Sequence, residues 1–444
     1  MELAGKQVII VGLGRSGVAA AQLCLSRGAQ VTGTDRSAKT KLCDAARNLP
    51  IDLVVGSHQG IAFDSADLII VSPGVPDFPE LARAQQAGVQ VIGELELAAR
   101  HCNGPIVAVG GTNGKSTVTS LLASMFANDN LRVFSGGNLG APLSEAVGSI
   151  WDVLVVEVSS FQLERAPSFH PKISILLNVT EDHLDRYPSF NAYADAKGNA
   201  FLRQEPGDTA VIPRGDELCE KQARRGRGRI VTFGNGGDFD VDARCIVEKA
   251  TGECFDFRAS RLFGTHNARN VAASIAAGRA MGLSRAAIER ALLEFIPLPH
   301  RMAYVGAIQG VRFYDDSKGT NVGASVTALS GLEEERGVLI AGGRDKLGDY
   351  TPLAEALKIK GRALVVLGEA GDRIAEATEG IVPILRVSNL QQAVNVAMQH
   401  AHPGDAVLLS PACSSFDMFS GYVERGEKFV AAVLQLQESR RVEQ

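Results

Sequence analysis

Residues 110–117, Gly-Gly-Thr-Asn-Gly-Lys-Ser-Thr, have the types and spacing of a loop that binds phosphate. They follow an apolar run at residues 106–109, a predicted strand, and precede a predicted helix at 117–127. Glycines let backbone N–H groups approach phosphate oxygens, Lys115 supplies a cation, and Ser116 can ligate Mg²⁺. Val109 stands where the strict motif has glycine, so this is a shortened variant. We predict that ATP binds Gly111, Thr112, Asn113, Gly114, Lys115, Ser116 and Thr117.

Two polar side chains come at the ends of later apolar runs. Glu157 lies near the end of the run at 152–158, where a carboxylate can hold Mg²⁺ against a nucleotide. His183 follows the run at 173–179 and could bind metal or position phosphate. Either could instead be structural, Glu157 as a surface carboxylate and His183 as a hydrogen-bonded histidine. The neighbouring phosphate loop favours a functional role for both.

The N-terminal region carries a second nucleotide signature. The run Gly-Leu-Gly-Arg-Ser-Gly at 12–17 lies between a predicted strand at 7–11 and a predicted helix at 18–26, and Asp35 ends the next strand. This arrangement binds a diphosphate at a helix N-terminus and a ribose hydroxyl at the carboxylate. NAD and a UDP-sugar both offer these groups, so the fingerprint alone does not choose between them. We expect the loop at 72–76 to line the same crevice.

Three loops in the last third of the chain carry lysines, hydroxyls and carboxylates at predicted strand ends. They comprise residues 315–321, 342–346 and 410–417. The carboxyl ends of parallel strands gather ligands at one edge of a sheet. Lysines and hydroxyls there suit an anionic amino acid, although polar loops also occur at sheet edges that bind nothing.

Apolar runs that alternate with helical stretches predict an α/β fold. The runs form three series, separated near residues 92–93 and at the prolines of 296–299. We therefore expect a Rossmann-like N-terminal domain at 1–93 and a central P-loop ATPase-type domain with a parallel sheet at 94–298. A Rossmann-like α/β domain is expected at 299–444.

Composition excludes several classes of protein. The 444 residues carry 45 basic and 50 acidic side chains, a net charge of −5, which argues against sequence-independent nucleic-acid binding. The basic run at 224–229 is short and broken by glycine, and we interpret it as a solvated turn instead of an anion site. No stretch approaches the ~20 apolar residues of a membrane span. The seven cysteines are scattered singly, so we expect reduced thiols in a cytoplasmic protein.

The sequence resembles the Mur ligase family over nearly its whole length. The resemblance rests on both glycine loops, on Glu157-Val158-Ser159-Ser160, and on the runs at 183–187, 196–197, 266–270, 299–301, 316–318 and 410–413. The last of these and the Rossmann-like first domain point to the branch that adds D-glutamate to UDP-N-acetylmuramoyl-L-alanine. The resemblance implies an ATP-dependent, cytoplasmic, bacterial ligase of peptidoglycan synthesis, and hence of cell shape and division, that acts as a monomer.

The resemblance also implies roles for individual residues. The UDP-precursor is expected to contact Gly14, Arg15, Ser16, Asp35, Arg36, Gly74 and Asn138. Beyond the phosphate loop, ATP is expected to contact Asn267, Asn270, Arg301 and Asp316. The D-glutamate pocket is expected from Lys318, Thr320, Lys346, Ser415, Phe416 and Tyr422. Gly319 and Tyr422 stand where alanine and phenylalanine are familiar in the family.

Catalysis is expected from Lys115, His183 and Lys197, with two Mg²⁺ ions at Ser116, Glu157, His183 and Lys197. The resemblance implies that Lys197 is carbamylated. An ammonium has no lone pair for a metal, whereas a carbamate offers anionic oxygens. A predicted helix after Pro188 places Lys197 on the same side as Tyr193.

The implied reaction begins when the precursor's carboxylate attacks the γ-phosphate of ATP to give an acyl phosphate. The amine of D-glutamate then displaces phosphate. Three alternatives remain: a sister amide ligase of the L-alanine-adding or folylpolyglutamate type, an NAD-dependent dehydrogenase, and a nucleotide-gated binding or scaffold protein. The phosphate loop with Glu157 speaks against the dehydrogenase, and the lysines of the last domain favour an acidic amino acid.

Overall fold

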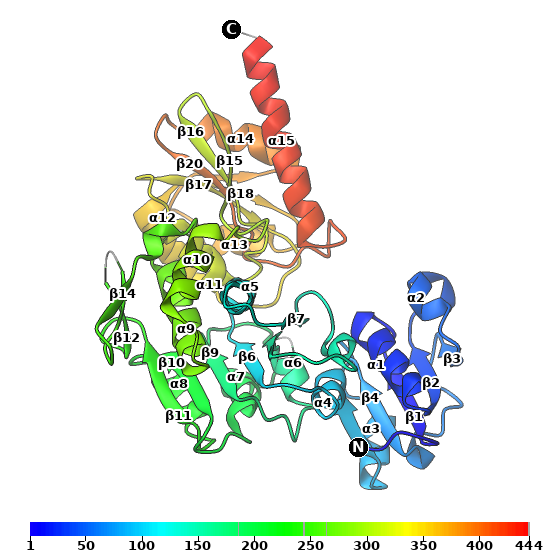
Figure 1. The fold of residues 1–444 in the computed structure, drawn as a ribbon. Helices are drawn as coiled ribbons and strands as arrows, with labels where there is room; N and C mark the ends of the chain where they lie inside the picture. The colour runs from blue at the N-terminus through cyan, green and yellow to red at the C-terminus, as the bar shows by residue number, and fades with distance from the viewer. Residues whose placement is uncertain (185, 243–244, 263, 443–444) are drawn as a thin grey trace. The chain divides into compact units, whose positions relative to one another are not determined.

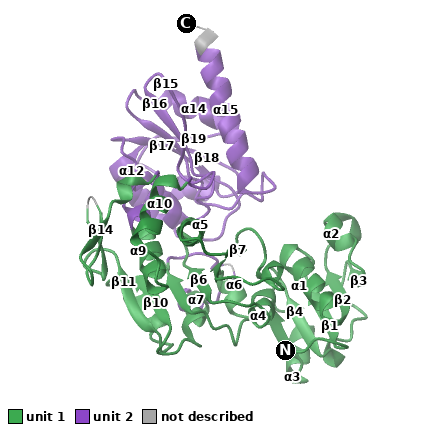
Figure 2. Cartoon of the chain, viewed as in Figure 1, with its two compact units in different colours: residues 1–179, 193–260, 269–295 green, residues 180–192, 261–268, 296–444 purple. Residues whose placement is uncertain are grey.

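The computed structural model describes residues 1–184, 186–242, 245–262 and 264–442. The chain forms two compact units (Figure 2). The first comprises residues 1–179, 193–260 and 269–295, and the second comprises 180–192, 261–268 and 296–444. The first unit contains two sheets and the second contains one. The predicted α/β class with three sheets is confirmed.

The first sheet is parallel throughout, with the order β3-β2-β1-β4-β5 (Figure 1). Its strands are β1 (Gln7–Val11), β2 (Gln30–Asp35), β3 (Asp52–Val55), β4 (Leu68–Val71) and β5 (Gln90–Gly93). The accompanying helices are α1 (Arg15–Ser26), α2 (Asp44–Arg47), α3 (Pro79–Gln86) and α4 (Glu94–Ala99). Side chains of β1 alternate between two cores, since Val8 and Ile10 pack on one face and Ile9 and Val11 on the other. The predicted Rossmann-like arrangement is confirmed.

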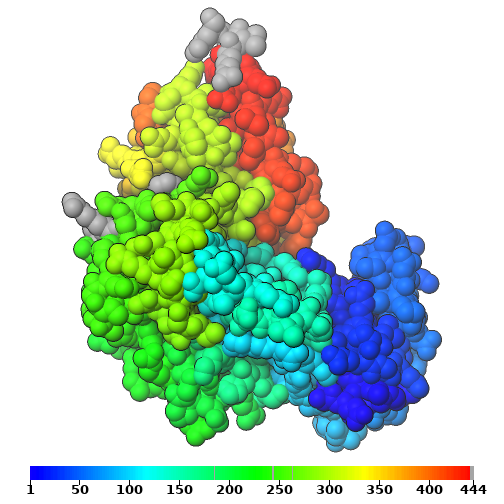
Figure 3. All heavy atoms as spheres, viewed as in Figure 1, coloured from blue at the N-terminus to red at the C-terminus, as the bar shows by residue number. Residues whose placement is uncertain are grey.

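The second sheet has the order β14-β13-β12-β11-β10-β9-β6-β8-β7. Its strands are β6 (Ile106–Gly110), β7 (Val133–Gly137), β8 (Val153–Glu157), β9 (Ile173–Leu176), β10 (Thr209–Pro213), β11 (Arg229–Phe233), β12 (Phe239–Val241), β13 (Ile246–Glu248) and β14 (Glu253–Phe255). The helices of this part are α5 (Lys115–Asn128), α6 (Ser160–Leu163), α7 (Phe190–Gly198), α8 (Glu217–Ala223), α9 (Thr265–Ala280) and α10 (Arg285–Glu294). Helix α10 packs against α5, as the adjoining surfaces in Figure 3 show.

The prediction of a parallel second sheet is right from β7 to β12 and wrong at the other edge. Strands β12, β13 and β14 pair antiparallel because short connections join them, whereas parallel neighbours need a longer crossover.

The expectation that all cysteines are reduced is also wrong here, because Cys245 and Cys254 form a disulfide. The β13–β14 hairpin brings these two residues to a Cα separation of 5.9 Å, a proximity that their spacing in the sequence did not reveal.

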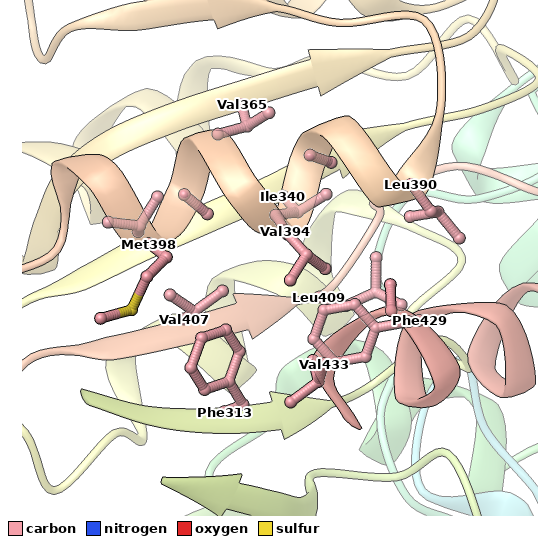
Figure 4. Packing of buried hydrophobic residues seen from close by; sticks show 14 of the residues in the cluster. Phe313, Ile340, Val365, Leu390, Val394, Met398, Val407, Leu409, Phe429 and Val433 are labelled. Carbon is pink, nitrogen blue, oxygen red and sulfur yellow. The ribbon is translucent and has the colours of Figure 1, made fainter. Parts of the chain in front are cut away.

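The sheet of the second unit has the order β15-β16-β20-β17-β18-β19 and is parallel except at the edge strand β15. Its strands are β15 (Ala303–Ile308), β16 (Val311–Asp315), β17 (Gly337–Gly342), β18 (Gly361–Leu367), β19 (Ile384–Arg386) and β20 (Ala406–Leu409). The helices are α11 (Val322–Ser330), α12 (Thr351–Lys360), α13 (Gly371–Ala377), α14 (Leu390–His400) and α15 (Tyr422–Val442). Phe313 and Phe429 anchor the core on one face, where α14 and α15 cover the strands (Figure 4). Among the residues that the structure describes, no helix has the length and apolar character to cross a membrane.

Candidate functional site

The phosphate-type loop joins β6 to α5 in the first unit. Lys115 is the first residue of α5, and its Nζ donates hydrogen bonds to the carbonyl oxygens of Gly111 at 3.0 Å and Thr112 at 2.9 Å. Gly114 precedes the helix with φ +87°, and a Cβ there would lie 2.5 Å from Oδ1 of Asn270. Glycine is therefore required at 114, both by its backbone angle and by the neighbouring asparagine. The ammonium group of Lys115 stays beside the backbone N–H groups that can receive a phosphate.

Asn178 stabilises this loop through hydrogen bonds to its backbone, a role that we did not predict. Its Oδ1 accepts from the backbone N–H of Asn113 at 2.9 Å, and its Nδ2 donates to the carbonyl oxygen of Asn113 at 3.1 Å. Its own carbonyl oxygen accepts from the N–H of Thr112 at 3.0 Å. The available signal was its position just after β9, the strand beside β6.

Glu157 ends β8, where the strand register pairs it with Val109 of β6 and Gly137 of β7. The residue is only 2% exposed. Its Oε1 accepts from Nδ2 of Asn138 at 2.7 Å, while Oε2 is buried and has no hydrogen-bond partner in the described part of the chain. Burying a carboxylate oxygen without a donor is costly unless the group is neutralised or meets a cation.

The oxygen donors of Glu157 and Ser116 are of the kind that Mg²⁺ prefers. Residues 1–184, 186–242, 245–262 and 264–442 contain no group of three or more His, Cys, Asp or Glu side chains that could hold a metal ion. Mg²⁺ commonly keeps water and takes nucleotide phosphates as further ligands, so two side-chain donors suffice for such a site.

Lys197 lies on α7 and is only 4% exposed. Its Nζ donates to the carbonyl oxygen of Gly111 at 2.9 Å and lies 4.5 Å from the ring centroid of Tyr193. The hydroxyl oxygens of Tyr193 and Thr112 are 3.2 Å apart. The predicted placement of Lys197 on the same helix face as Tyr193 is confirmed, and that face meets the phosphate-type loop.

A cleft of about 450 Å³ lies in the first unit at the carboxyl edge of the first sheet. Its lining includes six of the seven residues predicted to contact the UDP-precursor: Gly14, Arg15, Ser16, Asp35, Gly74 and Asn138. The seventh, Arg36, is not among the lining residues, and its guanidinium lies 5.9 Å from the ring centroid of Phe78. Gln162 also lines the cleft and was missed, since nothing in its local sequence marks it.

Asp35 connects this cleft to the glycine-rich turn before α1. Its Oδ2 accepts from the N–H of Leu13 at 2.8 Å and its Oδ1 from the N–H of Ser37 at 2.7 Å. Partial burial raises the pKa of Asp35, but these hydrogen bonds outweigh burial and hold the pKa below its usual value. An ionised carboxylate at the strand end can accept hydrogen bonds from a ribose.

The three polar loops predicted in the last third of the chain meet at one edge of the third sheet. The N–H of Gly342 donates to the carbonyl oxygen of Pro411, and that of Arg344 to Ser414, each at 2.8 Å. The N–H of Ala412 donates to the carbonyl oxygen of Gly319 at 2.9 Å. The strand order places β16, β20 and β17 side by side, which explains why these loops converge.

The side chains of these loops contact different partners within the second unit. Lys346 Nζ lies 3.0 Å from Oδ1 of Asp182, and these two residues line a small cavity of about 20 Å³. Lys318 Nζ lies 3.9 Å from the ring centroid of Tyr422. Ser415 is buried, whereas Phe416 is 66% exposed, and the N–H of Thr320 donates to the carbonyl oxygen of Lys318 at 2.8 Å. The residues predicted to bind D-glutamate thus lie on the loops of one sheet edge and at the start of α15, each with its own contacts.

Asp316 is a buried carboxyl group at this edge, 8% exposed. Its Oδ2 accepts from Oγ of Ser410 at 2.7 Å and its Oδ1 from the N–H of Met302 at 3.3 Å. Burial raises the pKa of Asp316 to about 7, against the opposing effects of the Ser410 hydrogen bond and the Arg301 charge. The predicted ATP-binding residues Arg301 and Asp316 are therefore neighbours.

The predicted metal and ATP residues divide between the two units. Ser116, Glu157, Lys197 and Asn270 belong to the first unit, and His183, Asn267, Arg301 and Asp316 belong to the second. His183 has φ +56°, and its Nε2 lies 3.7 Å from Oδ2 of Asp182. Asp185, part of the motif at 183–187, lies outside the described residues.

Comparison with known families matches three consecutive segments of this chain. Residues 6–93 match the Mur ligase MurD-like N-terminal domain, residues 109–278 match the Mur ligase middle domain, and residues 300–413 match the Mur ligase glutamate ligase domain.

Relatives of known name match nearly the whole chain. The UDP-N-acetylmuramoylalanine–D-glutamate ligase of Geotalea uraniireducens (strain Rf4) is 42% identical over 449 residues, which cover 98% of this chain and 99% of the relative. The ligase of the same name from Desulfosudis oleivorans is 44% identical over 455 residues, covering 99% and 98%. The structure of MurF ligase from Thermotoga maritima in complex with ADP is similar in fold, with a TM-score of 0.62 at 18% identity and coverage of 98% and 96%.

Proposed function

This chain belongs to the Mur ligase family, and we infer that it is the ATP-dependent ligase that adds D-glutamate to UDP-N-acetylmuramoyl-L-alanine in peptidoglycan synthesis. The reaction forms an amide bond and releases ADP and phosphate. Full-length identity of 42–44% to ligases of this name supports the choice of substrates over those of a sister ligase. The same identity argues against an NAD-dependent dehydrogenase and against a non-enzymatic scaffold protein.

The hydrogen bond between Asn138 and Glu157 supports our assignment of substrates to the cleft and to the phosphate-type loop. Asn138 lines the cleft of the first unit, and its amide also donates to Glu157 beside the phosphate-type loop. The cleft receives the UDP-precursor, and the loop receives the triphosphate of ATP. Asn138 therefore connects the two substrates that exchange a phosphoryl group. The proposed precursor contacts include Arg36 in addition to the residues that line the cleft.

The reaction begins with attack of the precursor's carboxylate on the γ-phosphate of ATP. The ammonium group of Lys115 and the loop N–H groups stabilise the negative charge that this transfer spreads over the phosphoryl oxygens. The amine of D-glutamate then attacks the acyl phosphate, the new C–N bond forms, and phosphate leaves. Lys346 is proposed to supply a positive charge for one carboxylate of D-glutamate. The full set of residues proposed to hold D-glutamate is Lys318, Thr320, Lys346, Ser415, Phe416 and Tyr422.

Two Mg²⁺ ions are proposed at Ser116, Glu157, His183 and a carbamylated Lys197. The unpartnered Oε2 of Glu157 supports a cation there. Bound Mg²⁺ supplies positive charge next to the phosphoryl oxygens. Asn267, Asn270, Arg301 and Asp316 are proposed to hold the rest of ATP.

We also propose the domain boundaries 1–93, 94–298 and 299–444, one for each substrate. The enzyme is proposed to act as a monomer in the bacterial cytoplasm, where its product contributes to cell shape and division. Sedimentation of the purified protein with and without substrates tests the monomer.

The function is tested with Lys115→Ala. This variant is expected to lose ligation while it still binds the UDP-precursor, because the precursor lies in a different part of the first unit. Phosphate release measures turnover and calorimetry measures precursor binding. Lys249→Ala, at a surface lysine paired with Asp240, is the control. Near-normal turnover of Lys115→Ala would show that the loop is not the ATP site.

A further inference from the structure

The basic run at 224–229 contains one arginine whose surroundings differ from those of its neighbours. The side chains of Arg224 and Arg227 are 67% and 70% exposed and pair with Glu220 and Glu205. This agrees with the interpretation of the run as a solvated turn. Arg225 is instead half-buried and contacts the end of α7, the helix that carries Lys197.

Arg225 makes three hydrogen bonds with its guanidinium group. Its Nη1 donates to the carbonyl oxygen of Asp195 at 2.5 Å and to Oε1 of Gln222 at 2.8 Å. Its Nη2 donates to Oδ1 of Asn199 at 2.9 Å. The last carbonyl groups of a helix lack partners within the helix, so a cation that donates to one of them stabilises that end.

Gln222 completes the contact from α8. It is fully buried, and its Nε2 donates to Oδ1 of Asp195 at 2.8 Å. Asp195 is therefore bound through its backbone by Arg225 and through its side chain by Gln222. It lies two positions before Lys197 on the same helix.

The contact leaves little room for a side chain at Gly198, next to Lys197. A Cβ at Gly198 would lie 2.0 Å from Oε1 of Gln222 and 2.5 Å from Nη1 of Arg225. An alanine side chain at this position would displace these two side-chain ends from their hydrogen bonds to α7 and to each other. The end of α7, which carries Lys197, is thus held by Gln222 and Arg225.

We propose that Arg225, together with Gln222, is a positioning residue for Lys197. It fixes the last turn of α7 so that Nζ of Lys197 stays at the phosphate-type loop, 2.9 Å from the carbonyl oxygen of Gly111. This inference rests on the proposed function, because the catalytic role of Lys197 is itself proposed. A misplacement of ~1 Å in a reacting group can cost ~10²-fold in rate.

The first test compares Arg225→Ala with Arg224→Ala. Arg225→Ala is expected to lower kcat by about 10- to 100-fold. The KM values for D-glutamate and for the UDP-precursor are expected to stay the same, because neither substrate is proposed to contact α7. Arg224→Ala removes the same side chain one position away and is expected to resemble the wild type. Arg225→Lys keeps the charge without the forked donor and is expected to restore part of kcat.

A second pair of variants tests the end of α7 without removing a charged side chain. Gly198→Ala is expected to lower kcat in the same way as Arg225→Ala. Gly207→Ala is the control, since the nearest atom to a Cβ there is Nζ of Lys172 at 3.6 Å. Thermal unfolding of each variant shows that it is folded at the assay temperature.

Lys197→Ala, assayed beside them, separates this inference from its premise. If Lys197→Ala is inactive while Arg225→Ala and Gly198→Ala keep wild-type kcat, the positioning role is overturned and the proposed function stands. If Lys197→Ala is active, the proposed role of Lys197 and the inference fall together. Loss of kcat in Arg225→Ala and Gly198→Ala, with both controls unchanged, supports the inference.

Discussion

In the second unit, Nζ of Lys346 lies 3.0 Å from Oδ1 of Asp182, and Nδ2 of Asn321 lies 3.1 Å from the other oxygen of that carboxylate. Burial raises the pKa of Asp182, but Lys346 and His183 outweigh burial and hold the pKa below its usual value. Asp182 is therefore ionised and balances the charge of Lys346. An anionic amino acid that binds Lys346 has to compete with this carboxylate.

We predict that Lys346→Ala raises the KM for D-glutamate by about 10-fold or more and leaves the KM for ATP nearly unchanged. The physical reason is the loss of a charge-assisted hydrogen bond to a substrate carboxylate, about 1.5–3 kcal/mol. Steady-state phosphate release with each substrate varied in turn measures both constants. Lys358→Ala, at an exposed lysine of α12 paired with Glu355, is the control. Equal increases in both constants would mean that Lys346 supports the active conformation without recognising the amino acid.

Asp35→Ala is expected to weaken binding of the UDP-precursor by about 10-fold, the effect of losing hydrogen bonds to a charged group. ATP affinity should not change, because the phosphate-type loop does not include Asp35. Calorimetry with each ligand checks both statements. Asp44→Ala, at an exposed carboxylate paired with Arg47, is the control. Tight binding of NADH to the wild-type protein would count against the assignment of this cleft to a UDP-sugar.

Lys197→Ala is expected to be nearly inactive and to regain activity when short-chain carboxylates are added. Lys197 points at the phosphate-type loop from a buried position, so its loss leaves a space in which a small carboxylate can replace a carbamate. Rates measured with and without formate or acetate test this. Lys172→Ala, at a half-exposed lysine paired with Asp208, should respond to neither change. Absence of rescue would indicate that Lys197 acts as a plain cation.

The buried carboxyl group of Asp316 predicts a pH dependence of stability. Its pKa is raised from 3.8 in the unfolded chain to about 7 in the folded protein. Its contribution to stability is therefore fully present below pH 3.8 and is lost as the pH rises through 7. Asp316→Asn removes this titration, so the stability of the variant relative to the wild type should increase as the pH rises from about 5 to about 8.

Urea unfolding of the protein without nucleotide, at several pH values, measures that difference. Each unit of pKa shift corresponds to about 1.4 kcal/mol at most. Asp372→Asn, at an exposed carboxylate, controls for the general effect of removing a charge. A difference between Asp316→Asn and the wild type that does not change with pH would contradict an elevated pKa.

The local chemistry of the site could be predicted from the sequence because it follows short-range patterns. The strand β1 has the predicted bounds, and the phosphate-type loop begins and ends at the expected elements. Lys197 meets Tyr193 because residues four apart share a helix face. The helices α1 and α5 begin at Arg15 and Lys115, two or three residues before their predicted starts, since their first turns contain glycine or polar residues that mask the periodicity.

Contacts between distant parts of the chain could not be predicted in this way. Lys346 and Asp182 are 164 residues apart, and no periodicity links them. Asn178 and Arg225 bind backbone groups of other segments. Only Asn178 had a signal in the sequence, its position just after a strand, and the neighbours of Arg225 carry none. The antiparallel pairing of β12–β14 was missed because each strand has only three residues, too few to show the alternation of a half-solvated antiparallel strand.

Phosphate release from the purified protein, with substrates supplied singly and together, tests the assignment of function most directly. We predict release only when ATP, Mg²⁺, UDP-N-acetylmuramoyl-L-alanine and D-glutamate are all present, with one amide product formed for each phosphate. L-Glutamate, L-alanine or the precursor without its L-alanine should not replace the proper substrates. Phosphate release that needs no D-glutamate, or amide formation with a different amino acid at a comparable rate, would contradict it.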